Sequence, residues 1–169
     1  MQHKTVRARS AIEIFLSRPS RLEPRFHKPL AGLERFLNGH RLTPRTLGTN
    51  QYTLQSPMDA VLELMDHCKG AIVLGYPQLK VSSGQINGKA VPLKPRLMHA
   101  TPWNHMEAVM AYAKDLPLLI IGHEGVTGGV FDKGVLGQYI FTANLAKDGW
   151  FRDKRIAGAF PQWLELVRR

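Results

Sequence analysis

Residues 71–74, with the sequence Ala-Ile-Val-Leu, are apolar without interruption and follow Gly70. This pattern is typical of a strand that is covered on both faces, whereas a strand with one face in water alternates apolar and polar residues. Residues 117–121, Pro-Leu-Leu-Ile-Ile, repeat the pattern further along the chain. The two segments therefore predict the centre of a parallel sheet with helices on both of its faces.

Strand and helix patterns alternate outward from this centre. Further strands are predicted at residues 11–16, 42–47 and 139–142. The second of these lies near a sheet edge, because Pro44 cannot donate to a ladder. Apolar residues at helical spacing predict helices over residues 26–37, 56–68 and 101–115, and a last helix over 150–169 that is broken at Pro161. The fold class is therefore α/β, a three-layer flavodoxin-like or Rossmann-like domain whose mainly parallel sheet has about five strands.

Residues 77–100 interrupt this alternation. They contain Asn87-Gly88, a strong signal for a hairpin turn, with apolar residues on both sides. We therefore expect an inserted hairpin or ordered loop. The expected organisation is a basic arm over residues 1–10, one domain over 11–149 that includes the 77–100 insertion, and an amphipathic helix over 150–169 packed on the same domain.

The net charge of +10 lies near the two ends of the 169-residue chain. Residues 1–50 hold ten basic and three acidic side chains, the next hundred are balanced, and residues 151–169 hold five basic and two acidic ones. The terminal excess has two interpretations: an amphipathic helix with a solvated side, or a surface for a nucleic acid, membrane or partner. No sequence signature of a nucleic-acid-binding fold is present, so nucleic acid is not the expected partner.

Several classes of protein are excluded by simple counts. Cys68 is the single cysteine, so it forms no internal disulfide and no cysteine-rich zinc site. The seven histidines show no metal-binding spacing, and we expect no metal. No apolar run is long enough to span a bilayer, and the start does not read as a signal peptide. A cytoplasmic protein is the expectation.

Candidate functional residues follow the predicted strands. The carboxyl ends of parallel strands share one edge of a sheet, where ligands of such folds bind. Side chains after the strands, or at the start of the helix that follows the insertion, should therefore meet at one cleft. These are Ser17, Arg18, Tyr76, Trp103, Asn104 and His123.

The segment 101–107, Thr-Pro-Trp-Asn-His-Met-Glu, adds a carboxylate to this cleft. Trp103 and Glu107 are four residues apart, so they share a face of a helix. The indole could stack on a base, while the carboxylate bonds ribose hydroxyls or stabilises a cationic sugar. A structural interpretation stands beside this one: with Asn104 as the N-cap, Glu107 would complete a capping box.

The Trp103-x-x-x-Glu107 pattern, which opens a helix after a strand, resembles the Toll/interleukin-1 receptor (TIR) domain of the bacterial type. In catalytic members, NAD cleavage depends on the glutamate four residues after a tryptophan. The resemblance implies that Glu107 is catalytic, that Trp103 or Tyr76 stacks on a ring, and that Arg18 or Arg21 faces the pyrophosphate. A related pattern occurs in nucleoside 2-deoxyribosyltransferases, which use a glutamate near a helix start as nucleophile on the sugar.

The function implied by this resemblance is cleavage of NAD to nicotinamide and ADP-ribose, or a cyclic isomer. NAD is the substrate, and no separate cofactor is needed. The resemblance further implies self-association and a separately encoded effector protein in bacterial antiphage defence. Two alternatives stay open: a non-catalytic module that binds a nucleotide or a protein, and a nucleoside deoxyribosyltransferase-like N-glycosidase.

Overall fold

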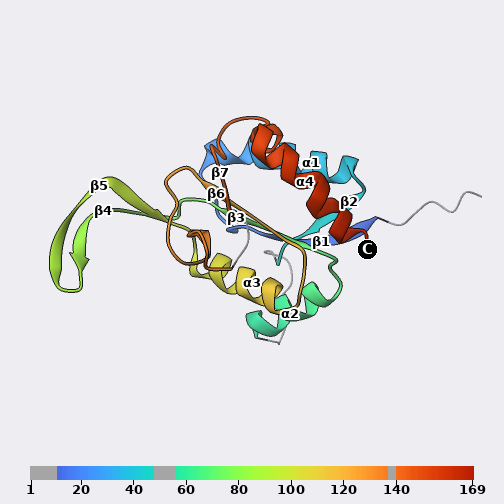
Figure 1. The fold of residues 1–169 in the computed structure, drawn as a ribbon, viewed down its shortest axis with the longest axis horizontal. Coiled ribbons are helices and arrows are strands. Elements are labelled where there is room, and N and C mark those ends of the chain that lie inside the picture. The colour runs from blue at the N-terminus through green and yellow to red at the C-terminus, as the bar shows by residue number, and fades with distance from the viewer. Residues whose placement is uncertain (1–10, 48–55, 137–139) are drawn as a thin grey trace, which may run out of the picture.

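The computed structural model describes residues 11–47, 56–136 and 140–169. The predicted basic arm over residues 1–10 lies outside the described residues, and so does Tyr139, the first residue of the last predicted strand. A central sheet separates two helical layers, and a long hairpin projects from the body (Figure 1). The predicted three-layer α/β fold is confirmed.

The central sheet has five strands in the order β2-β1-β3-β6-β7, and every neighbouring pair is parallel. β3 and β6, the two apolar segments on which the prediction rests, lie at its centre. β2, which contains Pro44, lies at an edge as predicted. The strands are β1 (Ile12–Ser17), β2 (Leu42–Arg45), β3 (Ala71–Gly75), β6 (Leu118–His123) and β7 (Ile140–Ala143).

Two helices cover each face of the sheet (Figure 1). α1 (His27–Gly39) and α4 (Lys154–Val167) lie on one face, and α2 (Pro57–Asp66) and α3 (Pro102–Ala113) lie on the other. Successive residues of a strand point to opposite faces. In β3, Ile72 and Leu74 enter the core under α1 and α4, whereas Ala71 and Val73 enter the core under α2 and α3.

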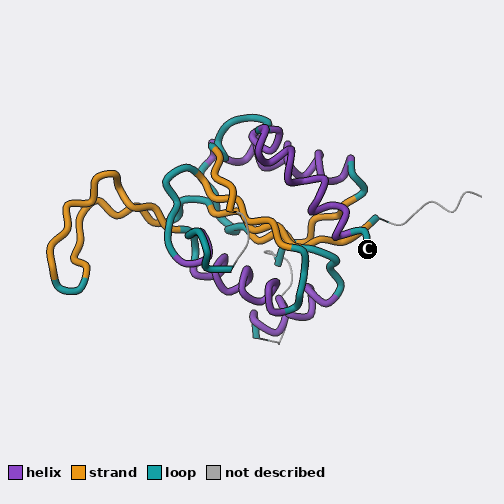
Figure 2. Tube along the Cα trace, in the orientation of Figure 1, coloured by secondary structure: helices purple, strands orange, loops and turns teal. Residues whose placement is uncertain are grey.

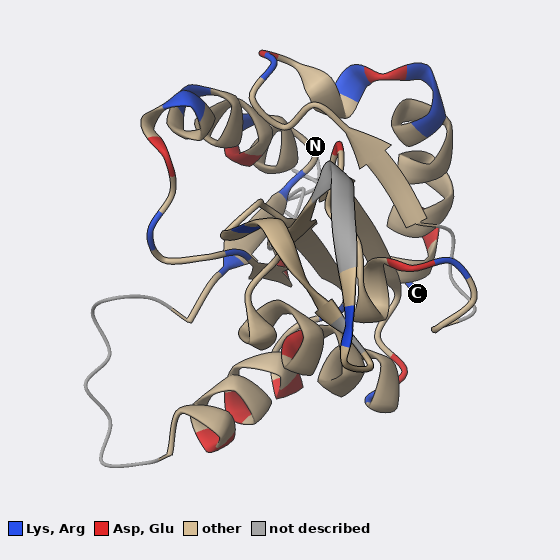
Figure 3. Ribbon diagram, turned by 90° about the vertical axis from the view of Figure 1, so that its left-hand side faces the viewer, with Lys and Arg blue, Asp and Glu red and all other residues tan. Residues whose placement is uncertain are grey.

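The two helical layers differ in charge (Figure 3). α2 contains three acidic residues, Asp59, Glu63 and Asp66, and no basic residue. α4 begins with Lys154 and Arg155. The part of the basic excess that lies near the C-terminus is therefore on the opposite side of the sheet from α2.

α4 is a continuous helix, so the predicted break at Pro161 is wrong. A proline inside a helix removes one hydrogen bond and costs about 3 kcal/mol. Phe160 and Trp163, on either side of Pro161, are both buried in the core. Burying a large apolar side chain contributes about 1.5–3 kcal/mol, so the packed face of α4 offsets the cost of the proline.

The predicted insertion is an antiparallel hairpin of β4 (Leu79–Ile86) and β5 (Lys89–His99). Asn87 and Gly88 form its turn with φ values of 50° and 74°, which is the left-handed backbone that an Asn-Gly turn provides. The two strands leave the body side by side (Figure 2). Three short 3-10 turns complete the described elements: η1 (Pro24–Phe26), η2 (Gly129–Phe131) and η3 (Trp150–Arg152).

Candidate active site

A pocket of about 400 Å³ involves the loop that follows the carboxyl end of β1, the start of α3 and the base of the hairpin. Its volume lies within the range of small-molecule sites, about 300–1,000 Å³. Four of the eight candidate site residues line it: Arg18, Arg21, Trp103 and Glu107. The remaining lining residues are Pro19, Ser20, Leu47, Pro57, Gln78 and Thr101.

Glu107 is the one carboxylate among the lining residues. It lies on the inner side of α3, and only 9% of its surface is exposed. Burial disfavours the charged form and raises the pKa of Glu107 to about 7, while a hydrogen bond from Ser17 lowers it. Glu107 is therefore a carboxyl group that changes its protonation state near neutral pH.

Ser17 and Asn104 lie behind Glu107 and do not line the pocket. The Ser17 hydroxyl donates to Glu107 Oε2 at 2.5 Å, and Asn104 Nδ2 donates to Ser17 Oγ at 2.8 Å. Each of the two side chains is only 1% exposed. This corrects the prediction that they bind substrate, because both are buried and their polar groups contact Glu107 or each other.

The N-terminus of α3 is capped without Glu107. Thr101 is the N-cap, and Asn104 at the third helical position completes a capping box with it. Pro102 occupies the first helical position, where its missing N–H removes no intrahelical bond. The alternative in which Asn104 is the N-cap and Glu107 completes the capping box is therefore wrong. Glu107 lies one turn further along the helix and is free to serve the pocket.

Two arginines bring positive charge to the pocket. Arg18 lies near Glu34 of α1, with 3.9 Å between Nε and Oε1, and its Nε is buried without a hydrogen-bond partner among the described residues. Arg21 is exposed. With Glu107, these two side chains are the charged residues of the lining, so an anionic ligand meets a net positive pocket.

Trp103 gives the pocket an aromatic wall. Its side chain lies at the start of α3 and remains 41% exposed, although a large apolar ring usually lies buried. Leu47 and Pro57 add further apolar surface to the lining. The pocket therefore combines a flat aromatic surface, two cations and a buried carboxylate.

Tyr76 does not reach the pocket. Its side chain is fully buried, and its ring packs edge-on against Phe26 with 5.0 Å between the ring centroids. Burial raises the pKa of its hydroxyl, which has no hydrogen-bond partner among the described residues. This corrects the prediction that the Tyr76 ring stacks on a ligand.

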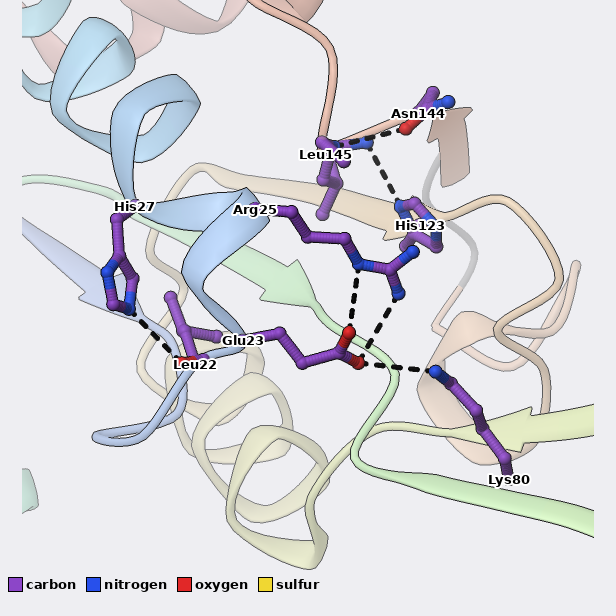
Figure 4. A network of polar contacts seen from close by, with 9 residues as sticks. Leu22, Glu23, Arg25, His27, Lys80, His123, Asn144 and Leu145 are labelled. Carbon is purple, nitrogen blue, oxygen red and sulfur yellow. Dashed lines mark hydrogen bonds and ion pairs between the residues drawn. The ribbon is translucent and has the colours of Figure 1, made fainter.

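His123 also lies apart from the pocket, in the same layer as Tyr76. Its Nδ1 accepts a hydrogen bond of 3.1 Å from the backbone N–H of Leu145, and burial lowers its pKa (Figure 4). Beside it, the Glu23 carboxylate pairs with Arg25 and Lys80 (Figure 4). His123 is not among the residues that line the pocket, which corrects its placement at the predicted cleft.

Two lining residues that flank the hairpin in sequence were not predicted. Gln78 precedes β4 and Thr101 follows β5, so both lie at the base of the insertion. Their positions hold a usable signal: a segment inserted between a strand and the next helix begins and ends at the ligand-binding edge of the sheet. The insertion therefore contributes directly to the pocket rim.

The described residues offer neither a metal cluster nor a membrane span. Among the described residues, no three His, Cys, Asp or Glu side chains are grouped so that they could hold a metal ion. Within the same residues, no helix combines the length and apolar character needed to cross a bilayer.

Comparison with known proteins gives a likeness of overall shape. No protein-family model matches the chain, and no curated protein matches it. Among solved structures, a CMP N-glycosidase from Clostridium botulinum superposes with a TM-score of 0.49 at 15% sequence identity. The match covers 91% of this chain and 98% of the other. The TIR assignment therefore remains a prediction from sequence.

Proposed function

We propose that this protein cleaves the N-glycosidic bond of a nucleotide, with NAD as the substrate and Glu107 as the catalytic carboxylate. The observation that carries the proposal is the position of Glu107. It is a buried carboxylate in a pocket that also holds two arginines and an exposed tryptophan. These groups match the three parts of a nucleotide: phosphate, base and sugar.

Binding of the nucleotide follows from ordinary pairing rules. Arginine forms strong bidentate hydrogen bonds with phosphate, which assigns Arg18 and Arg21 to the pyrophosphate. The exposed face of Trp103 stacks on a planar ring, as aromatic side chains do with bases. With the phosphates and a ring held in this way, the sugar between them faces Glu107.

The reaction breaks the bond between ribose C1′ and the nicotinamide nitrogen. The electron pair of that bond stays with nicotinamide, which leaves neutral, and the ribose develops oxocarbenium character. The Glu107 carboxylate stabilises this positive charge or captures C1′ transiently. A water molecule then adds to C1′ and releases one proton, giving ADP-ribose; attack by an adenine nitrogen instead gives a cyclic isomer. Only the ionised form of Glu107 can perform this role.

A nucleoside deoxyribosyltransferase-like N-glycosidase is the second candidate. In this reaction the ionised Glu107 attacks C1′ as the nucleophile, and the neutral nucleobase leaves with a proton taken from solvent. Water then displaces the sugar from Glu107. The two candidates therefore differ in the leaving group, and a comparison of substrates separates them.

The test measures base release from a panel of substrates. Purified protein is incubated with NAD, nucleoside monophosphates and deoxynucleosides over a range of protein concentrations, because the resemblance also predicts self-association. Free nicotinamide or free base is measured by chromatography. We expect nicotinamide release that is lost in Glu107→Gln and kept in Glu124→Gln, whose carboxylate lies outside the pocket. Equal release by Glu107→Gln would reject the proposal. Release from monophosphates or deoxynucleosides alone would favour the second candidate.

A further inference from the structure

A chain of hydrogen bonds connects the N-terminus of α3 to the catalytic carboxylate. Asn104 donates to Ser17, and Ser17 donates to Glu107. The chain joins two segments that are 87 to 90 positions apart in sequence, β1 and α3. Buried polar side chains normally bond to the backbone or to water, so a buried chain of three side chains is uncommon and calls for an explanation.

The direction of these hydrogen bonds is determined at Asn104. The N–H and the hydroxyl of Thr101 both lie within hydrogen-bond distance of Asn104 Oδ1, at 3.3 and 2.8 Å. Only the amide oxygen can accept these two bonds, so the NH₂ group of Asn104 must face the other way. It faces Ser17 Oγ, to which it donates. The cap of the helix therefore determines how the amide is oriented.

The orientation of the amide determines where the Ser17 proton goes. Ser17 Oγ accepts from Asn104, and its single proton is directed to Glu107 Oε2 at 2.5 Å. One oxygen of the carboxylate is thus held by the protein. Because Ser17 and Asn104 are buried and Glu107 lines the pocket, the other oxygen is the one available to a substrate.

Charged groups on the surrounding elements do not explain the raised pKa of Glu107. Burial and the Ser17 hydrogen bond are the causes of its pKa shift. α2 contributes three exposed carboxylates, and β6 contributes His123, which lies in the opposite layer. Besides Glu107, the titratable or charged side chains on the loop after β1, on α2, on α3 and its C-cap, and directly after η2 are Arg18, Arg21, Glu23, Asp59, Glu63, Asp66, His105, Tyr112, Lys114, Asp132 and Lys133.

We infer that Asn104 and Ser17 are positioning residues for the reaction proposed above: Asn104 directs the Ser17 hydroxyl proton onto Glu107, which keeps one carboxylate oxygen fixed and the other ionised toward the sugar. The inference rests on the proposed function for its role in catalysis. The direction of the hydrogen bonds, however, can be tested without any substrate.

The substitution Asn104→Asp reverses the hydrogen bond between residue 104 and Ser17. The new carboxylate keeps the oxygen that accepts from Thr101, and an acidic residue near a helix N-terminus is favourable, so α3 stays capped. The group that faces Ser17 changes from donor to acceptor and competes with Glu107 for the hydroxyl proton. Added negative charge alone also disfavours an ionised Glu107, so the two effects must be separated.

A double-mutant cycle with Ser17→Ala separates them. The carboxyl carbons of glutamate are labelled with ¹³C, and the Glu107 signal is assigned by its absence in Glu107→Gln. Its titration midpoint is then followed by NMR. We expect Ser17→Ala to raise the midpoint by about one to two pH units. We expect Asn104→Asp to raise the Glu107 midpoint by a larger amount when residue 17 is serine than when it is alanine. Asn144→Asp, which adds the same charge at a side chain that also accepts a backbone bond, should leave it unchanged.

The outcomes distinguish this inference from the proposed function. Equal shifts by Asn104→Asp in both backgrounds, or no shift in Ser17→Ala, would overturn the inference. If Asn104→Asp fails to fold, Asn104→Ala takes its place, with a rise expected only in the Ser17 protein. Where the wild type releases nicotinamide, the midpoint of its pH–rate profile should move with the NMR midpoint. NMR shifts as expected without nicotinamide release would support the hydrogen-bonded chain and reject the NAD reaction.

Discussion

The carboxyl edge of the sheet carries two different environments, one on each face. On the side of α2 and α3, Ser17, Asn104 and Glu107 form a polar chain that ends in an open pocket. On the side of α1 and α4, Tyr76 and His123 pack against Phe26 and are closed to solvent. The sequence predicts one cleft at this edge, whereas the structure has a pocket on one face and a sealed core on the other.

The alternation of side chains along a strand explains the difference. In β1, Ser17 has the same parity as Phe15, which packs under α2 and α3. In β6, His123 has the parity of Leu119 and Ile121, which pack under α1 and α4. Parity therefore accounts for Ser17, Tyr76 and His123, whereas Arg18, which has the parity of Leu16, reaches Glu34 of α1 and still lines the pocket.

The largest effect that separates the two faces is on catalysis. Glu107→Gln should lower nicotinamide release by about 10³-fold, because it removes the charge that stabilises the sugar cation. His123→Asn keeps an acceptor for the Leu145 N–H and should change release by no more than about threefold. Initial rates with saturating NAD measure both variants. A loss in His123→Asn comparable to that in Glu107→Gln would show that the two faces act as one site.

The next effect concerns the cations of the pocket. Arg21→Ala should raise the KM for NAD by about tenfold with a smaller change in kcat, because an exposed arginine contributes binding to the phosphates rather than to the reacting atoms. Arg35→Ala removes an equal charge from a different pocket, beside Lys28 and Phe36, and serves as the control. Equal KM values in the two variants would mean that net charge, and not the pocket, attracts the substrate.

Much of the fold was predictable because its signals are local. Unbroken apolar runs identify β3 and β6, Pro44 places β2 at an edge, and Asn87-Gly88 identifies the hairpin turn. The break at Pro161 was predicted wrongly because the energy that keeps α4 whole comes from packing against the sheet, which no local pattern contains.

The candidate site was predictable only in part for a similar reason. Arg18, Trp103 and Glu107 were found from strand order and helical spacing, and Arg21 from the family resemblance. The inward orientation of Ser17 and Asn104 depends on a contact between β1 and α3, which are distant in sequence. The exclusion of Tyr76 and His123 needed the parity of their strands, which the sequence does contain.

A smaller effect is expected on stability, and it depends on pH. The pKa of Glu107 rises from 4.5 to about 7 on folding, so between these values the folded state binds more protons than the unfolded state. Its contribution to stability is therefore full below pH 4.5 and is lost as the pH rises through 7. Glutamine has no carboxyl group to ionise, so Glu107→Gln does not lose stability in this way. The variant should be more stable than the wild type at pH 8 by about 2–3 kcal/mol.

Thermal unfolding at two pH values measures this difference. At pH 8, Glu107→Gln should melt roughly 5 °C above the wild type, given about 2–4 °C per kcal/mol for a domain of this size. At pH 4.5 the two proteins should melt within about 2 °C of each other. If Glu107→Gln melts below the wild type at pH 8, the ionised Glu107 carboxylate does not destabilise the folded state, and the expected effect of its burial is wrong.

The smallest effect tests the sealed face directly. The Tyr76 hydroxyl is buried without a hydrogen-bond partner among the described residues, so Tyr76→Phe removes a polar group that burial leaves unsatisfied. We expect the free energy of unfolding to rise by about 1 kcal/mol or to stay unchanged, and the rate of nicotinamide release to be unaffected. Tyr112→Phe, at a half-exposed side chain of α3, is the control and should change stability by less than about 0.5 kcal/mol. A tenfold loss of activity in Tyr76→Phe would mean that the hydroxyl reaches the substrate. In that case the division of the sheet edge into an open face and a sealed face would be wrong, whereas unchanged activity leaves the pocket beside Glu107 as the reacting side.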